Sequence, residues 1–400
     1  MIIYIPINSP AVEGKRFDNN FTNPGIGGTE YLSIILGWSL AKKYVDLNVR
    51  LISSHIFFLD KPPCNLQLII ENPAIVFNSS INEQVFWILT VAVASQLDPV
   101  AIKLRKSHIA LWSHHPSDWR ALSLKPNINL MISTGYYQYI SNYYYLPCNL
   151  LINNIYYRQS RNERTTVIAN KSSFNVMFLG ALVPAKGFHY VLRYWNEIKS
   201  KVPCAILHVI GGSKLYGIES DNSSLFPCDS EYAKLLEKIV TKYVIDLSDV
   251  KFYGSCGSER FDIYKLMDVA IINPTGITES FSFNIHECLD FGIPVISSDD
   301  YGLNDTMRYF SDLVVKSPKE IPEKIAYARM IIGNDDSFYA KANDFIDMIE
   351  LRNDGALEMW YNVINGCQKC NSYRLNRIIC IKAMFRSGIG RIKHMINKYF

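Results

Sequence analysis

Residues 273–287 read Asn-Pro-Thr-Gly-Ile-Thr-Glu-Ser-Phe-Ser-Phe-Asn-Ile-His-Glu, and residues 292–296 read Gly-Ile-Pro-Val-Ile. The pattern predicts a buried strand, a turn and then a helix. The start of such a helix carries unpaired backbone N–H groups and the positive end of the helix dipole, which favour an anion. Glu279 lies before this start, and Glu287 lies roughly 6–9 Å inside the helix at ~1.5 Å per residue.

This layout suits a nucleotide sugar, whose diphosphate lies between the hydroxyls of its sugar and those of its ribose. Carboxylates hydrogen-bond vicinal hydroxyls, so Glu279 and Glu287 are candidate ligands on the two sides of the diphosphate. The alternative is an ordinary capped helix that carries one acidic residue in its first turns.

Strand and helix patterns alternate on both sides of this stretch. Continuous apolar runs of four to six residues suit parallel strands that are covered on both faces. Strands are predicted at 2–5, 49–53, 66–70, 108–112, 129–133, 175–179, 205–210, 250–253, 269–272 and 294–297. Helices are predicted at 29–43, 187–199, 231–244, 259–267 and 283–291. The fold class is therefore α/β, with two tandem Rossmann-like, doubly wound domains that face each other across a ligand cleft.

The domain boundaries follow from a polar stretch that begins at Arg158 and interrupts the alternation. We expect an N-terminal domain at 1–157, a linker at 158–170, a second domain at 171–350, and C-terminal helices with a basic tail at 351–400. A chain of 400 residues exceeds the size of one hydrophobic core, which agrees with two domains.

The composition is that of an ordinary globular protein, with 48% apolar and 20% charged residues. Residues 1–6 lack a basic leader, and the longest apolar run, 85–94, is about half the length that spans a bilayer. These features predict a cytoplasmic protein without a transmembrane segment. The nine scattered cysteines indicate free thiols, although Cys367 and Cys370 have the spacing of half a zinc site or of a redox pair.

Two further loops have the chemistry of an anion site. Residues 178–187 place Lys186 beside glycines at the start of a helix, where a cation is unfavourable unless an anion offsets it. The alternative is a solvated loop lysine. Residues 25–30 read Gly-Ile-Gly-Gly-Thr-Glu, so Gly27 and Gly28 allow close approach of the backbone to a ligand at a second helix start. This loop lacks the third glycine of a dinucleotide-binding fingerprint.

Together these three loops resemble those of the family-4 retaining glycosyltransferases, which have the GT-B fold (glycosyl transferases group 1). The resemblance covers about residues 1–350. It rests on a Glu-x7-Glu signature with Asn-Pro and Gly-x-Pro-Val flanks, on a Gly-x-x-x-x-x-Lys-Gly loop, and on Gly-Gly-x-Glu. It implies an N-terminal domain on the acceptor side and a C-terminal domain that binds the nucleotide sugar.

The resemblance also implies roles for single residues. Glu279 would contact the donor sugar, Glu287 the ribose, and Lys186 the diphosphate. His114, or its neighbour His115, would face the donor sugar at a strand end, where it could bind a hydroxyl or assist the departing phosphate. The remaining implied donor-binding positions are Gly27, Gly28, Gly211, Gly212, Ser280, Phe281, Ser282 and Phe283.

The sequence departs from the family pattern at several positions. Ala181 occupies the place of the second phosphate-binding cation, and Lys214 is a candidate replacement. Ser280 and Ser282 stand where that family often has glycines. No Asp-x-Asp metal motif occurs in the cleft elements, so we expect no cofactor and a metal-independent reaction.

The tail carries a charge asymmetry. Residues 359–400 contain eight basic and no acidic residues, while the net charge of the chain is +4. Within 371–400, apolar residues recur at steps of three or four with basic residues between them, which is typical of a membrane-surface helix. The alternative is a last helix packed on the body. The body lacks a basic face or stacking motif, so we expect no nucleic-acid partner.

The function predicted from these features is a retaining transfer of a sugar from a nucleotide sugar to a lipid-linked or oligosaccharide acceptor. We expect it to act in bacterial surface polysaccharide (O-antigen or capsule) synthesis, at the inner face of the cytoplasmic membrane. Two alternatives remain open at this point. One is another GT-B enzyme, such as an epimerase or phosphorylase, and the other is a non-catalytic, membrane-associated binding protein for nucleotide sugars.

Overall fold

The computed structural model divides the chain into two compact units. Unit 1 comprises Met1–Tyr157 together with the described residues that follow Met348, and unit 2 comprises Arg158–Met348. The structure describes residues 1–80, 85–104, 108–115, 120–124, 128–146, 148–160, 172–212, 225–277, 279–334, 336–366, 381–382 and 384–385.

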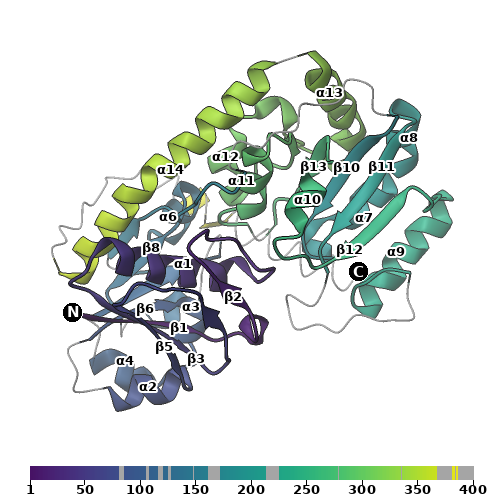
Figure 1. The fold of residues 1–400 in the computed structure, drawn as a ribbon. Coiled ribbons are helices and arrows are strands. Elements are labelled where there is room, and N and C mark those ends of the chain that lie inside the picture. Colours follow the sequence, from purple (N-terminus) through teal and green to yellow (C-terminus); the bar gives the residue numbers. More distant parts are fainter. Residues whose placement is uncertain are drawn as a thin grey trace. The chain divides into compact units, whose positions relative to one another are not determined.

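Unit 1 is built on a parallel sheet with the strand order β5-β3-β1-β6-β7-β8-β9 (Figure 1). Its strands are β1 (Ile2–Ile7), β3 (Asn48–Ser53), β5 (Leu66–Ile70), β6 (Val85–Thr90), β7 (Ile109–Ser113), β8 (Leu130–Ser133) and β9 (Cys148–Leu151). A small ribbon pairs β2 (Arg16–Phe17) with β4 (Phe58–Leu59). The central strands are continuous apolar runs because helices cover both faces of the sheet; all of β6 is buried.

The helices of unit 1 are α1 (Gly28–Lys43), α2 (Pro73–Ser79), α3 (Val91–Ala94), α4 (Pro99–Leu104), α5 (Ala121–Leu124) and α6 (Tyr136–Asn142). Helix α1 packs on β1 and β3 and is buried on most sides, from Tyr31 to Ala41, which explains why its sequence is apolar around its whole circumference.

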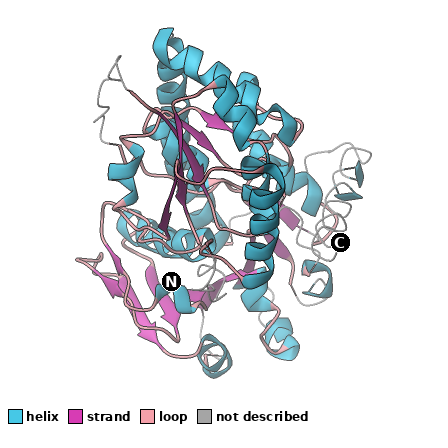
Figure 2. Cartoon of the chain, turned by 90° about the vertical axis from the view of Figure 1, so that its right-hand side faces the viewer, coloured by secondary structure: helices cyan, strands magenta, loops and turns pink. Residues whose placement is uncertain are grey.

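Unit 2 has a parallel sheet of five strands in the order β12-β11-β10-β13-β14. They are β10 (Phe174–Leu179), β11 (Ala205–Ile210), β12 (Val250–Gly254), β13 (Val269–Ile271) and β14 (Val295–Ile296). Its helices are α7 (Phe188–Arg193), α8 (Trp195–Lys201), α9 (Ser230–Tyr243), α10 (Arg260–Tyr264), α11 (Phe283–Asp290), α12 (Asn304–Met307) and α13 (Ile321–Asn334). Helix α7 packs with α9 and α8 with α13, and Figure 2 shows helices on both sides of the strands.

The long helix α14 (Asp336–Ile364) begins in unit 2 and ends in unit 1. Within unit 1, Asn353 accepts a hydrogen bond from the backbone N–H of Tyr156 (3.1 Å) and donates one to its carbonyl (2.6 Å). Within unit 2, Arg158 contacts Asp347 at 2.5 Å. Residues 349–364 pack as part of unit 1, whereas 351–400 was predicted as a region separate from both domains.

Several elements differ from the sequence predictions. Strands β2, β4, β6 and β9 and helices α2 to α6, α12 and α13 were not predicted, and α14 lies only partly in the region 351–400 where C-terminal helices were expected. The helix predicted at 187–199 is divided at Tyr194 into α7 and α8. The run at 85–94, noted only for its hydropathy, forms β6 and the whole of the short helix α3. Its first part is a strand because β1 and β7 pair with it on both edges.

Among the described residues, no helix is both long and apolar enough to cross a membrane.

Free thiols among the described residues are Cys64, Cys204, Cys228, Cys256 and Cys288. Cys148 on β9 is disulfide-bonded, so the prediction that all the cysteines are free was wrong for this one. Cys367 and Cys370 lie outside the described residues.

Candidate functional site

In unit 2, the loops after β10 and β13 bring a cation and a carboxylate together. Lys186 ends a short 3-10 helix after β10, and Glu279 lies in the loop after β13. Because these two strands are neighbours and parallel, their carboxyl ends meet at one edge of the sheet. The Lys186 ammonium group donates a short hydrogen bond to Oε1 of Glu279, and the two side chains are 14% and 15% exposed.

The two loops are also fixed to each other by contacts close to the backbone. The Thr275 hydroxyl donates to the carbonyl oxygen of Ala185 at 2.5 Å. Gly187 has a φ of +80°, and a Cβ placed on it would lie 2.7 Å from Cγ2 of Thr275. The glycine therefore allows both the left-handed turn into α7 and the close approach of the loop after β13. Asn273 Nδ2 lies 3.4 Å from the Glu279 oxygen that Lys186 contacts.

The segment from Ser280 to Phe283 leads into helix α11. Ser280 and Ser282 are buried, and Ser282 is the N-cap residue without a capping hydrogen bond from its side chain. Phe281 and Phe283 are partly exposed, and their ring centroids lie 5.5 Å apart. Only Ser280, Phe281 and Ser282 lie between Glu279 and the first residue of α11, so an anion-favouring helix start follows the Lys186–Glu279 pair closely in the chain.

Glu287, on the second turn of α11, is buried and lies within an ion pair. It is 3% exposed, and Arg260 of α10 binds both of its oxygens, with Nε at 3.1 Å from Oε2 and a terminal nitrogen at 2.5 Å from Oε1. Tyr264 donates a third hydrogen bond to Oε2 at 3.1 Å. A carboxylate has about four acceptor positions, so Glu287 retains roughly one for a further donor.

Electrostatics keep Arg260 charged and Tyr264 neutral. Burial alone would lower the pKa of Arg260, but the charge of Glu287 outweighs it and the pKa is raised. Burial, and then the same carboxylate, raise the pKa of Tyr264 well above its ordinary value. Arg260 and Tyr264 were not among the predicted site residues, since no local sequence pattern pairs them with a residue on a later helix.

Gly211 and Gly212 follow β11 at the same edge of the sheet. A Cβ at Gly211 would lie 1.9 Å from the carbonyl oxygen of Gly180, the residue that follows β10. The N–H of Gly211 donates to the carbonyl of Gly254, the last residue of β12, at 2.7 Å. The ends of β10, β11 and β12 are therefore packed together at backbone distance. Lys214 lies outside the described residues.

In unit 1, Gly27 and Gly28 begin helix α1. Asn23 organises their loop, since its Oδ1 accepts hydrogen bonds from the N–H groups of Gly25 and Ile26, both at 2.9 Å. The carboxyl group of Glu30 lies against Gly27, where a Cβ would be only 2.5 Å from Oε2. Burial raises the pKa of Glu30. The carboxyl group of Glu30 therefore already lies beside the start of α1.

His114 and His115 follow β7, also in unit 1. The buried side chain of Gln138 fixes this turn by donating to the carbonyl of Ser113 (3.0 Å) and to that of His115 (2.5 Å). His114 packs edge-on against Trp112 with ring centroids 4.4 Å apart, while His115 is exposed. Burial, with a smaller contribution from His115, lowers the pKa of His114 to about 3. His114 is therefore neutral near pH 7, which suits a hydrogen bond to a hydroxyl better than proton donation as an imidazolium.

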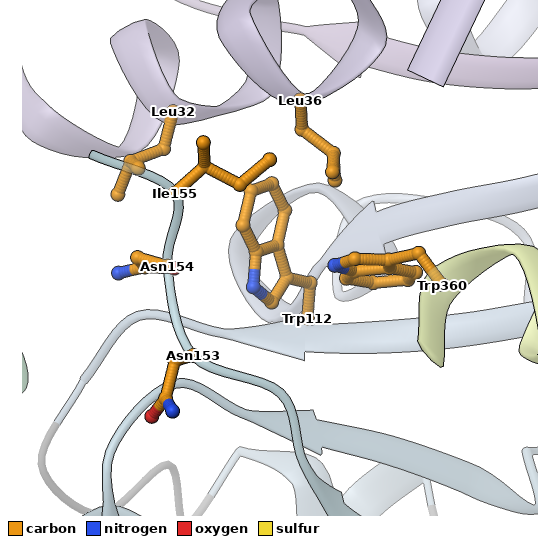
Figure 3. A pocket seen from close by; sticks show the side chains of 7 residues that line it. All are labelled: Leu32, Leu36, Trp112, Asn153, Asn154, Ile155 and Trp360. Atoms are coloured by element: carbon orange, nitrogen blue, oxygen red, sulfur yellow. The ribbon is translucent and has the colours of Figure 1, made fainter. Parts of the chain in front are cut away.

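A small pocket of unit 1, with an empty volume of about 170 Å³, lies beside this turn. Its lining consists of Leu32, Leu36, Trp112, Asn153, Asn154, Ile155 and Trp360. Figure 3 shows Trp112 between Trp360 and Ile155. All of these residues except Asn153 are buried, so the pocket is a gap within the packed side chains and not an open substrate site. Within the described part of the chain, the indole N–H of Trp112 and the amide of Asn154 have no hydrogen-bond partner.

Comparison with known proteins agrees with this description of unit 2. Residues 159–335 match the family model "Glycosyl transferases group 1". The matched segment contains the Lys186–Glu279 pair, Glu287 and both glycines after β11. It does not extend into unit 1, and no curated protein matches the chain.

Solved structures show the same fold at low sequence identity. HepE of Anabaena in complex with UDP-glucose is 14% identical, with 87% of this chain and 99% of that chain covered and a TM-score of 0.56. A glycosyltransferase of Rickettsia africae is 11% identical, with 93% and 99% covered and a TM-score of 0.60. WaaG, a glycosyltransferase involved in lipopolysaccharide biosynthesis, is 12% identical, with 92% and 100% covered and a TM-score of 0.53. The predicted GT-B fold is confirmed.

The predicted site residues thus form two groups. Unit 2 brings together Lys186 and Glu279 beside Ser280–Phe283, with Gly211 and Gly212 at the same edge of its sheet. It holds Glu287 in a separate ion pair. Unit 1 holds the other group, Gly27, Gly28, His114 and His115. Among the described residues, no three His, Cys, Asp or Glu side chains are grouped as metal ligands.

Proposed function

We propose that the protein is a glycosyltransferase that moves a sugar from a nucleoside diphosphate to an acceptor hydroxyl. One observation carries the proposal: Lys186 and Glu279 meet at the start of α11, inside the segment that matches the glycosyltransferase model. A diphosphate needs the cation and the helix start, and a sugar needs the carboxylate. HepE, which has the same fold, has been crystallised with UDP-glucose, and this supports a nucleotide sugar as donor.

In the proposed reaction, the acceptor hydroxyl oxygen forms a bond to the anomeric carbon. The bond from that carbon to the diphosphate breaks, its oxygen keeps the electron pair, and the acceptor proton passes to the leaving diphosphate. Lys186 and the N–H groups of α11 stabilise the negative charge that grows on the leaving group. Attack on the face that the diphosphate leaves would retain the anomeric configuration. We propose that the reaction needs no metal or other cofactor, because Lys186 and the N–H groups of α11 can neutralise the diphosphate charge.

The test begins with the donor. A thermal-shift screen of nucleotide sugars identifies it, since a ligand at 100 times its Kd adds roughly 2.7 kcal/mol of stability. Release of nucleoside diphosphate is then measured with and without candidate acceptors, and again in EDTA. We expect release that depends on acceptor and persists in EDTA. Complete loss of activity in EDTA, restored by Mn²⁺ or Mg²⁺, would contradict the metal-free site.

One observation favours a second candidate, a binding protein without turnover. Arg260 and Tyr264 occupy most of the hydrogen-bonding capacity of Glu287, a residue that the family resemblance assigns to the donor. Nucleotide-sugar binding without release of nucleoside diphosphate, in the presence of a broad set of lipid-linked and oligosaccharide acceptors, would establish this alternative. An exchange of sugar epimers without acceptor would instead indicate an epimerase.

For the acceptor and location, we propose a lipid-linked or oligosaccharide acceptor in surface polysaccharide synthesis, with the tail at the inner face of the cytoplasmic membrane. The basic residues of 371–400 support attraction to anionic lipid. Most of the tail lies outside the described residues. Of the described part, Ile381 and Phe385 are exposed, whereas Met384 packs against the core of unit 1.

Because of Met384, substitution tests the membrane proposal better than truncation. Changing Arg386, Arg391, Lys393 and Lys398 to Gln leaves the packed residue in place. We expect the wild type to sediment with vesicles of anionic lipid at low salt, and this variant to remain in solution with an unchanged thermal transition. Equal sedimentation of both proteins would show that the basic tail does not bind the membrane.

A further inference from the structure

The Lys186–Glu279 pair joins the two groups that bind opposite ends of the donor in the proposed function, on which this inference rests. We propose that Glu279, through this ion pair, makes the site select the intact nucleotide sugar over the nucleoside diphosphate product. The selection follows from competition: the carboxylate and the diphosphate are both anions that need the same ammonium group.

The pair is built into the fold and is not an incidental surface contact. Its side chains are only 14% and 15% exposed, so water screens their interaction less than it would at the surface. The two loops are held together by the bond from Thr275 to Ala185 and by the close approach at Gly187. Without large rearrangement of these loops, Glu279 stays near any phosphate that Lys186 binds.

The intact donor gives Glu279 new hydrogen-bond partners in place of Lys186. Its sugar hydroxyls donate hydrogen bonds to the carboxylate, and such charge-assisted bonds are stronger than neutral ones. The carboxylate then turns toward the sugar, while Lys186 binds the diphosphate. The attraction of Glu279 to the sugar hydroxyls and of Lys186 to the diphosphate thus replaces the attraction between Lys186 and Glu279.

After transfer, the product provides no hydroxyl groups for Glu279. The freed terminal phosphate also carries about one more negative charge near neutral pH than it did as a diester. Glu279 now repels the product and again competes for Lys186. Re-formation of the ion pair therefore favours product release and limits product inhibition.

The experiment compares Glu279→Gln with wild type by calorimetric titration without acceptor. The probes are UDP, GDP and ADP, and then the nucleotide sugar of whichever binds wild type most tightly. We expect the nucleoside diphosphate to bind Glu279→Gln about tenfold more tightly than wild type, and the nucleotide sugar to bind no more tightly. Asp249→Asn is the matched control, because Asp249 pairs with Lys199 at 2.7 Å elsewhere in unit 2. This control should leave both affinities unchanged.

A double-mutant cycle assigns the effect to the pair itself. In a Lys186→Gln background, Glu279→Gln should increase the affinity for the nucleoside diphosphate by about threefold or less. The carboxylate and the diphosphate then have no ammonium group for which to compete. Unchanged or weaker binding of the diphosphate by Glu279→Gln, in a wild type that transfers sugar, would overturn this inference alone. A wild type that neither binds nucleotides nor transfers sugar would overturn the proposed function as well.

Discussion

Arg260 and Glu287 form a buried two-point ion pair, although 27 residues separate them in the sequence. Their side chains are 6% and 5% exposed, and Tyr264 completes the arrangement. Removal of one buried partner leaves an uncompensated charge, which is far more costly than removal of both. This pair therefore predicts a strong non-additivity in stability.

We expect Arg260→Met to lower the free energy of unfolding by roughly 3–5 kcal/mol, and Arg260→Met/Glu287→Leu to lower it by much less. Urea unfolding followed by tryptophan fluorescence measures these two variants and Glu287→Leu alone. If the double variant is as unstable as the sum of the two single variants, the two side chains are not coupled as the structure shows.

The role proposed for Lys186 predicts a loss of turnover. Lys186→Ala should reduce turnover by roughly 100- to 1,000-fold, since one preorganised donor at a site of developing charge contributes ~3–4 kcal/mol. Lys186→Arg should restore only part of the turnover, because a planar guanidinium group replaces a compact ammonium group. Lys199→Ala, on a cation elsewhere in unit 2, is the control and should remain active. Turnover of Lys186→Ala above about a tenth of wild type would place the phosphate cation elsewhere.

The close contact at Gly211, after β11, predicts that glycine-to-alanine substitutions at two positions have opposite effects on stability. Gly211→Ala places a Cβ 1.9 Å from a backbone oxygen, and it should displace the loop, lower the thermal midpoint and weaken nucleotide binding. Gly355→Ala, inside α14 and with no atom within 4 Å of the new Cβ, should raise stability by roughly 1 kcal/mol. Thermal unfolding with and without nucleotide measures both effects. A Gly211→Ala protein as stable as wild type would contradict the close approach of the two loops.

Buried histidines predict destabilisation in acid. Burial lowers the pKa of His286 to about 3, below its ordinary value of 6.5. Between these values the unfolded chain binds a proton that the folded protein does not, so stability is lost as the pH falls below 6.5. At pH 5 the loss from this one residue is roughly 2 kcal/mol.

The variant His286→Gln tests this assignment, because its amide can still bond to Thr306, which lies 3.1 Å from the imidazole. We expect a smaller drop in the free energy of unfolding between pH 7 and pH 5 than in wild type. Equal drops in the two proteins would show that His286 is not the group that titrates.

The sequence by itself determined the alternation of strands and helices, and hence the α/β class with two tandem parallel sheets. Continuous apolar runs such as 269–272 identify strands covered on both faces, because that pattern is local to each segment. It also placed the turn and helix start after residue 279, since helix ends have unpaired N–H groups wherever they occur.

Only the tertiary structure decided which charges meet. Lys186 and Glu279 are 93 residues apart, and they pair because β10 and β13 lie side by side in the sheet. Glu287 fitted the ribose role in sequence, yet the packing of α10 against α11 gives its carboxylate to Arg260. Strand order and helix packing depend on the whole core, so residue spacing along the chain does not encode these partners.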